Sequence, residues 1–291
     1  VLIVRVPLSD VELPETIWNI NTLSYLNIKK LEFATWGFIF PDGNLEVSPD
    51  LDHLDTLNLA IDTAKDTCKR HLQKILKKLP SIRRLKCWRP YRLQAALRNC
   101  DKILVFDCLN QLQSLCLTDF GGYGFKFPLN LKKLTLKWNY QPWSEISTIG
   151  KLPHLEVLKL LDDSFIGEEW EMKEGEFPSL RVLKLSDLGI RRWTASSGNF
   201  SHLEKLVVDN CDELEEVPSC LGECPTLETI EVTDCPESVA NSVNQIRQEQ
   251  LDMGNAILKI VIENPSEEES NSQEAEEISS ETESFDSGES E

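Results

Sequence analysis

Short leucine-rich segments recur along this chain of 291 residues. KLPHLEVLKL begins at Lys151, FPSLRVLKL at Phe177 and NFSHLEKLVV at Asn199. Each ends in two apolar residues separated by one other residue, which we call an L-x-L pair. Self-similarity of this kind indicates a repeat architecture. Ten pairs recur at intervals of 19 to 31 residues: Leu2 and Val4, Leu26 and Ile28, Leu57 and Leu59, Leu85 and Cys87, Leu115 and Leu117, Leu134 and Leu136, Leu158 and Leu160, Leu183 and Leu185, Leu206 and Val208, and Ile230 and Val232.

The L-x-L pair has a simple structural meaning. Successive side chains of a β-strand point to opposite faces, so the two apolar residues share one face and the x residue lies on the other. One such unit cannot bury its apolar face alone, but units stacked in parallel about 4.8 Å apart form a continuous core. We therefore predict an α/β solenoid over residues 1–262, a horseshoe of about ten repeats with a parallel sheet on its concave side. ILKIVI, around Ile260 and Ile262, is a candidate eleventh strand, and Asp66–Leu85 is the longest helix that we expect among the connections.

The C-terminal segment has a different composition. Residues 263–291 hold twelve acidic residues and no Lys or Arg. They also have too few large apolar side chains to offset the chain entropy lost on folding. We therefore predict a disordered acidic tail, whose simplest role is to keep the protein in solution. The formal net charge of −19 argues against general nucleic-acid binding, which uses a basic surface.

The residues that often carry chemistry form no recognised motif. Cys211, Cys220, Cys224 and Cys235 lack the paired C-x2-C knuckles of zinc sites. GKLPHL, which begins at Gly150, lacks the first glycine and the hydroxyl residue of a phosphate-binding loop. The four histidines have no indicated partner for a nucleophilic triad. We expect a chain that is not an enzyme, with no catalytic residue, no metal and no cofactor of its own.

Composition also bears on location. The nine cysteines are odd in number and follow no secretion signal, which is typical of reduced thiols in the cytoplasm. No apolar run approaches the roughly 18 residues that a membrane span needs. The stretch Cys68–Arg84 is basic and amphipathic, so peripheral association with a membrane surface is an alternative. A solvated helix on the outer side explains the same pattern more simply.

The x positions of the concave face are candidate binding residues, because they can vary without disturbing the core. We expect Lys159 and Lys184, from neighbouring repeats, to lie side by side. One interpretation is that lysines simply fill solvated positions. The other is a basic, partly aromatic inner stripe that docks an acidic patch of a partner. The candidate partner-binding residues are Lys86, Trp88, Thr135, Lys137, Trp138, Lys159, Lys184 and Lys205.

Several segments resemble the leucine-rich repeats of plant intracellular immune receptors of the nucleotide-binding, leucine-rich-repeat type. They are LPETIWNINTLSYL from Leu13, SFIGEEWEMKEGEFPSLRVLKLSDL from Ser164, and CDELEEVPSCLGECPTLETIEVTDCPESV from Cys211. The run G-x-x-W-x-x-x-x-G-x-F-P-x-L, from Gly167 to Leu180, is the most specific of these signals. Residues 1–262 together resemble the C-terminal half of coiled-coil receptors of the late-blight-resistance kind from nightshade-family plants. In such repeats, cysteine replaces asparagine in the turn after the strand.

The resemblance implies a recognition and autoregulatory domain. In this family the domain senses a pathogen effector, directly or through a guarded host protein, and holds the receptor's own nucleotide-binding domain at rest. Activation leads to defence signalling and hypersensitive cell death, and ATP or ADP is bound by the nucleotide-binding domain. The chain opens inside a repeat, so we expect a fragment or a truncated product of a longer receptor. The alternative is a stand-alone leucine-rich-repeat scaffold or an F-box-like ubiquitin-ligase adaptor, although an F-box needs a helical segment before the repeats.

Overall fold

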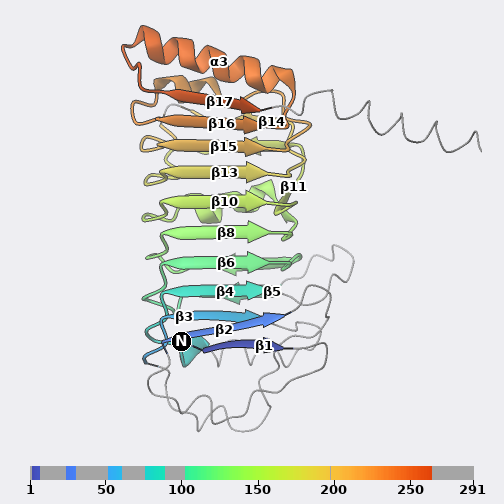
Figure 1. The fold of residues 1–291 in the computed structure, drawn as a ribbon, viewed down its shortest axis with the longest axis vertical. Helices are drawn as coiled ribbons and strands as arrows, with labels where there is room; N and C mark the ends of the chain where they lie inside the picture. Colours follow the sequence, from blue (N-terminus) through green and yellow to red (C-terminus); the bar gives the residue numbers. More distant parts are fainter. Residues whose placement is uncertain are drawn as a thin grey trace, which may run out of the picture.

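A parallel sheet of eleven strands, stacked one above the next, is the main element of the computed structural model (Figure 1). The structure describes residues 2–6, 24–30, 52–60, 76–88, 102–196 and 198–263. In their order across the sheet, the strands are β1 (Leu2–Val6), β2 (Tyr25–Lys30), β3 (Thr56–Ala60), β4 (Arg84–Trp88), β6 (Ser114–Thr118), β8 (Lys133–Lys137), β10 (Val157–Leu161), β13 (Val182–Ser186), β15 (Lys205–Asp209), β16 (Thr229–Thr233) and β17 (Lys259–Glu263).

The register of the sheet confirms the predicted solenoid. Leu158 of β10 lies beside Leu134 of β8 and Leu183 of β13. The same register relates every neighbouring pair of strands, so the L-x-L pairs form two continuous apolar rows. β17 confirms the eleventh strand, with Ile260 beside Ile230. The first apolar residue of each pair is at most 2% exposed from β3 to β16: Leu57, Leu85, Leu115, Leu134, Leu158, Leu183, Leu206 and Ile230.

Two sequence expectations fall largely outside the described residues. The first is the expected helix Asp66–Leu85, most of which lies outside the described residues. Its predicted end is wrong, because residues 81–83 are not helical and β4 begins at Arg84. Pro80 explains the early end, since proline has no N–H to donate inside a helix. The acidic tail is the other, except that Glu263 is the last residue of β17.

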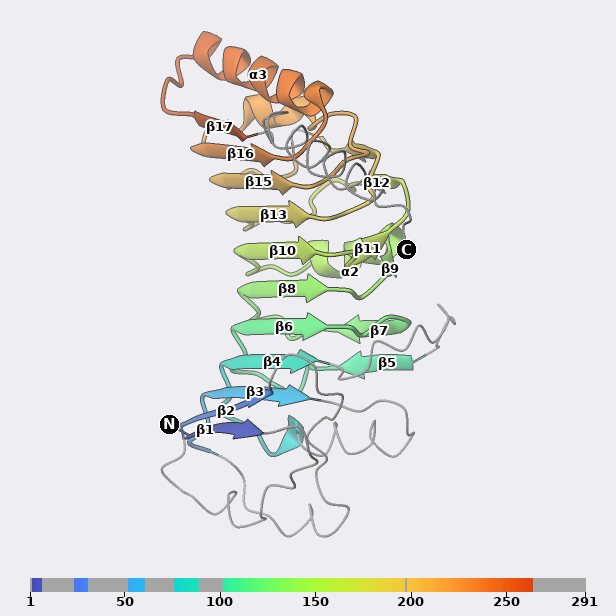
Figure 2. The ribbon, with the colours of Figure 1, turned by 45° about the vertical axis from the view of Figure 1, so that its right-hand side comes forward.

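Short elements line the side opposite the main sheet (Figure 2). Three pairs of short parallel strands lie there: β5 (Lys102–Val105) with β7 (Tyr123–Lys126), β9 (Gln141–Pro142) with β11 (Phe165–Ile166), and β12 (Glu169–Glu171) with β14 (Arg192–Thr194). The helical connections described there are η2 (Trp143–Glu145), α2 (Ile146–Gly150) and η3 (Ser219–Glu223). The core therefore lies between the main sheet and this outer layer.

Three tryptophans from successive repeats stack inside this core. The ring centroids of Trp143 and Trp170 lie 4.9 Å apart, and those of Trp170 and Trp193 lie 5.1 Å apart with the rings 4° from parallel. The indole Nε1 of Trp143 donates a hydrogen bond of 2.9 Å to the carbonyl oxygen of Gly167, whose φ is +111°. The glycine and the tryptophan of the G-x-x-W run are thus packing residues of the outer layer. We call Trp143, Trp170 and Trp193 the tryptophan stack.

Helix α3 (Glu237–Asp252) covers the C-terminal end of the stack of strands (Figure 1). It buries Val239, Val243, Ile246 and Gln250, which fall on one helical face. The side-chain Nε2 of Gln250 donates to the carbonyl oxygens of Gly222 at 2.6 Å and Cys224 at 2.9 Å. A solenoid needs such a cap because its last repeat has no neighbour to cover it.

Candidate functional site

The concave face carries the x residues, as the alternation within each strand requires. The predicted neighbours Lys159 and Lys184 are register partners on β10 and β13. Thr135 is the partner of Lys159 on the other side, and Lys86 of β4 lies in the same row, opposite Cys116 of β6. The candidate residues therefore share one surface, and their charges decide what it can bind.

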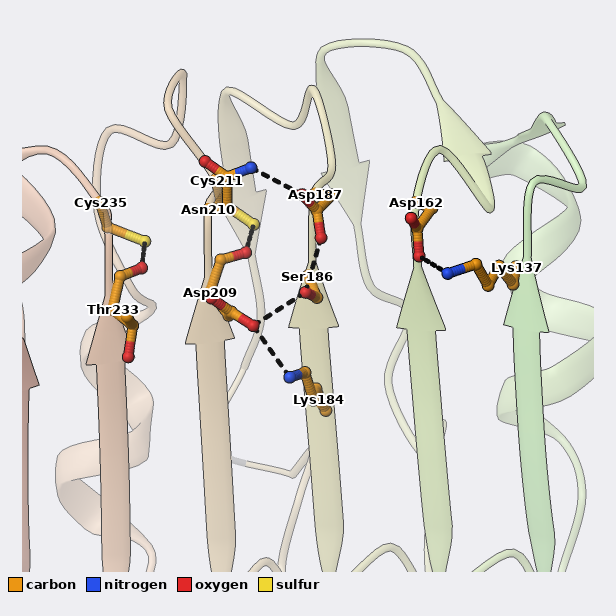
Figure 3. A network of polar contacts seen from close by, with 10 residues as sticks. All are labelled: Lys137, Asp162, Lys184, Ser186, Asp187, Asp209, Asn210, Cys211, Thr233 and Cys235. Atoms are coloured by element: carbon orange, nitrogen blue, oxygen red, sulfur yellow. Dashed lines mark hydrogen bonds and ion pairs between the residues drawn. The ribbon is translucent and has the colours of Figure 1, made fainter. Parts of the chain in front are cut away.

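Three of the predicted lysines form ion pairs with carboxylates of the next repeat. Lys137 Nζ lies 2.8 Å from Asp162 Oδ2, and Lys184 Nζ lies 2.9 Å from Asp209 Oδ2 (Figure 3). Lys205 Nζ lies 2.6 Å from Glu231 Oε1. The inner stripe is thus not uniformly basic, because these carboxylates offset the lysine charge.

The pair of Lys184 and Asp209 belongs to a larger polar network at the carboxyl end of β13 and β15 (Figure 3). The hydroxyl of Ser186 lies 3.0 Å from Asp209 Oδ2 and 2.8 Å from Asp187 Oδ2. Asn210 Nδ2 donates to Asp187 Oδ1 at 2.6 Å. The hydrogen bond from Lys184 is the main cause that lowers the pKa of Asp209, and the one from Ser186 adds to it. This network joins two repeats and keeps Lys184 from being a free cation.

The turns after the strands favour aspartate and asparagine for a backbone reason. From β6 to β16, the residue that follows each strand of the main sheet has a positive φ, a conformation that Asn and Asp tolerate better than most residues. Trp138 is the bulky exception, and the Nζ atom of Lys137 lies 4.2 Å from its ring centroid. The acidic edge of the sheet thus follows from the turn geometry. The residues with positive φ that follow these strands are Asp119, Trp138, Asp162, Asp187, Asn210 and Asp234, with φ between 45° and 65°.

On β4 to β10, three lysines of the concave face form no ion pair with an acid among the described residues. Lys86, Lys133 and Lys159 are exposed, and no ion pair joins them to a carboxylate among the residues that the structure describes. We call these three residues the cationic patch. Lys133 was not among the predicted binding residues, although Lys205, which holds the same position before its own L-x-L pair, was. Half-buried Thr135 lies within the patch, and half-buried Trp88 ends β4 at its border.

The cysteine side chains in the C-terminal repeats bond to the backbone. The thiols of Cys211 and Cys235 donate to the carbonyl oxygens of Asp209 and Thr233, at 3.5 and 3.2 Å (Figure 3). Burial raises the pKa of Cys211 to about 12, so its thiol stays protonated. Asn139 fills the equivalent place after β8, where it accepts from Phe120 N and donates to the carbonyl of Leu117. These contacts support structural thiols, and the described part of the chain has no group of three or more His, Cys, Asp or Glu side chains that could hold a metal ion.

The stacked repeats, the buried leucine rows and the open concave sheet have a counterpart among known families. A family model described as a leucine-rich repeat region matches residues 3–253. The chain belongs to the leucine-rich repeat family. The match runs from β1 to the residue after α3, and so includes ten of the strands in the main sheet.

Late blight resistance protein homologs from Solanum demissum are among the relatives of this chain. The chain is 32% identical to one of them over 270 residues, a match that covers 86% of this chain and 19% of the relative. It is 33% identical to a second over 264 residues, covering 86% of this chain and 21% of that one. The resemblance to late-blight-resistance proteins is therefore confirmed, and the chain spans about a fifth of the length of these relatives.

The solved structures that resemble this chain are more distant in sequence. The TLR13–ssRNA13 complex is 14% identical with a TM-score of 0.48, and covers 85% of this chain and 37% of its own. The leucine-rich repeat domain of the type III effector XCV3220 (XopL) is 16% identical with a TM-score of 0.33, and covers 77% of this chain and 72% of its own. Within the described residues of the present chain, no helix is long and apolar enough to cross a membrane.

Proposed function

We propose that this leucine-rich repeat chain is the recognition and autoregulatory domain of a plant disease resistance receptor. The observation that carries the proposal is the 32% identity, over 86% of the chain, to a relative named for late blight resistance. In this role the domain senses a pathogen effector or a guarded host protein in the cytoplasm, and also contacts the receptor's own nucleotide-binding domain. ATP or ADP acts in that other domain, and this chain recognises partners without catalysing a reaction.

The geometry supports a recognition role because it separates folding from binding. The leucine rows are buried, whereas the x residues of the same strands are solvent-accessible on the opposite face. Substitutions at the x positions therefore leave the core intact and change only the surface that a partner meets. Such a surface can be retuned to new partners while the repeats keep their shape.

The cationic patch is the part of this surface that we propose as the docking site. Lys86, Thr135 and Lys159 lie in one row, and four neighbouring strands span about 14 Å at the usual strand spacing. Positive charge on an interface steers an acidic partner and disfavours a basic one. Control of the receptor follows if the effector binds this surface more tightly in the active state than in the resting state, since a ligand shifts an equilibrium only by its different affinity for the two states.

The test reverses the patch in a receptor that contains this chain. A variant with Lys86→Glu, Lys133→Glu and Lys159→Glu should lose effector-triggered cell death if the patch contacts the effector side. It should show spontaneous cell death if the patch contacts the switch domain. Lys184 is left unchanged, because a glutamate there would face Asp209 and disturb the fold.

The matched control is Lys151→Glu, an exposed lysine in the connection that follows α2. It should behave as wild type in both assays. Wild-type behaviour of the triple variant as well, at a normal protein level, would contradict the proposed docking site.

A further inference from the structure

Four neighbouring strands of the concave face carry positive charge only. β4, β6, β8 and β10 together hold five Lys or Arg and no Asp or Glu. β13, β15, β16 and β17 instead hold three lysines and three acidic residues. From β4 to β10 positive charge therefore exceeds negative charge on the main sheet, whereas the two signs balance from β13 to β17.

Ion pairs neutralise two of these five cations, and the remaining three form the cationic patch. Arg84 Nη2 lies 2.5 Å from Asp55 Oδ2, and Lys137 is paired with Asp162. Lys86, Lys133 and Lys159 are left without such partners in the described part of the chain. On the rest of the described surface, several exposed cations are paired with an acid of a neighbouring repeat: Lys126 with Asp107, Lys132 with Glu156, Arg181 with Glu204, Arg191 with Glu215, and Arg192 with Glu169.

The same chain contains a segment of the opposite charge. Residues 264–291 hold eleven Asp or Glu and no Lys or Arg, beginning with Glu267, Glu268 and Glu269. We propose that this acidic segment docks on the cationic patch as an internal ligand, and that it competes there with any other acidic partner. Two observations indicate the acidic segment as the occupant of the patch: its charge is complementary to that of the patch, and it is covalently connected to the same sheet.

The distances allow the contact. The acidic segment follows Glu263 of β17, which lies four strands from β10 and seven strands from β4 in the sheet. At about 4.8 Å per strand, these separations are about 19 and 34 Å. A flexible chain of 28 residues has a root-mean-square end-to-end distance of about 30 Å. This average reach matches the span from the end of the solenoid to the patch.

Covalent connection makes a weak contact effective. A flexible linker whose average length matches the span gives an effective concentration in the millimolar range. A separate acidic partner must displace the segment. The apparent affinity of that partner is therefore its intrinsic affinity multiplied by the fraction of patches that the segment leaves free. Salt weakens the contact because the charges are exposed to solvent. The acidic segment would thus set a threshold for docking on the concave face without adding to the folded core.

Zero-length carbodiimide cross-linking of the full chain tests this contact, because the reagent joins a carboxylate to a lysine only when the two touch. At low ionic strength we expect cross-links from residues 267–291 to Lys86, Lys133 and Lys159 within one molecule. Their yield should fall about fivefold or more in 0.5 M salt, where screening is strong. The pairs of Lys184 with Asp209 and of Lys205 with Glu231 are internal positive controls, because the structure already places them in contact.

Three results would overturn the inference. The acidic segment could link to the outer lysine Lys151 as often as to the patch, it could link only between differently isotope-labelled molecules, or it could give no link while both control pairs react.

An independent measurement uses ¹⁵N NMR of the full chain with Lys86→Glu, Lys133→Glu and Lys159→Glu, after circular dichroism has shown the variant folded. Signals of residues 264–291 should gain about twofold in intensity over wild type as docking is lost, and equal intensities would contradict docking.

The two proposals fail separately. The cross-linking experiment uses the purified chain alone, so its failure would remove the internal ligand and leave the proposed receptor function untouched. A receptor assay that showed no role for the patch would leave the cross-links in place. The shared element is the cationic patch, whose exposure the structure describes for each of its three lysines.

Discussion

Replacement of Trp170 by alanine tests how the outer layer stabilises the solenoid. The side chain is 1% exposed, and its ring centroid lies 4.9 Å from that of Trp143 and 5.1 Å from that of Trp193, both stacked. The ring of Phe177 is nearly perpendicular to it, with the centroids 6.2 Å apart. A buried tryptophan removes about 150–250 Å² from water, which at about 25 cal/mol per Å² amounts to about 4–6 kcal/mol. Measured aromatic-to-alanine changes in cores cost about 3–5 kcal/mol. We expect Trp170→Ala to lower the free energy of unfolding by about 4 kcal/mol.

Trp170→Phe is the matched control, because it keeps an aromatic ring in the stack. The buried indole N–H of Trp170 has no hydrogen-bond acceptor among the described residues, so the phenylalanine loses no hydrogen bond there. We expect a cost of about 1–2 kcal/mol, smaller than for alanine, because the phenyl ring fills most but not all of the space of the indole. Urea unfolding followed by far-UV circular dichroism gives the free energies, and near-UV circular dichroism reports the stacked indoles. An alanine variant within about 1 kcal/mol of wild type, or a phenylalanine variant as unstable as alanine, would refute the reasoning.

Four further predictions address the core, the ion pairs and the acidic segment. Leu183→Ala should cost about 2–5 kcal/mol in urea unfolding, because its side chain is fully buried in the leucine row. Lys184→Glu should destabilise the chain by about 1 kcal/mol more than Lys159→Glu, since only the former faces Asp209; equal thermal unfolding midpoints would contradict this. The fold lowers the pKa of Asp209, so the carboxylate stabilises the folded state fully above the unfolded-state pKa of about 4. This stabilisation is lost as the pH falls through the lowered pKa of the folded state. Asp209→Asn should therefore make the free energy of unfolding less pH-dependent below about pH 4. Truncation after Glu263 should leave the melting temperature in 0.5 M salt unchanged within about 2 °C, and a larger fall would show that the acidic segment packs on the core.

The leucine rows could be predicted from the sequence because one physical requirement repeats in every strand. Each L-x-L pair must face the core, and a shift by one residue would expose both of its apolar side chains. The register of Leu158, Leu183 and Leu206 follows directly from this rule. Helix α3 was not predicted, although its apolar residues at 239, 243 and 246 have helical spacing. The L-x-L pairs mark only the strands, and a cap that occurs once has no repeat to reveal it.

The charges of the candidate site could be predicted only in part. Lys184 and Asp209 are 25 residues apart in sequence, and their pairing depends on the register and on the turn that places Asp209 at the end of β15. The residues between the apolar pairs alone therefore indicated a basic stripe. The carboxylates that neutralise part of it lie at the ends of the neighbouring strands or just after them. Lys133 could have been predicted, because it is the first residue of β8 just as the predicted Lys205 is the first residue of β15.

Transfer of recognition between receptors is the most direct measurement of the central claim, that the concave face of this chain selects a partner. The x residues of β4, β6, β8 and β10 would be placed in a related leucine-rich repeat receptor whose trigger is known, and the reverse exchange would be made in a receptor that contains this chain. Cell death would then be scored in leaves against the trigger of each parent, with outer-layer exchanges as the control. We predict that the response follows the concave residues in both directions. A response that stays with the recipient's loops and outer layer, at equal protein levels, would contradict the claim.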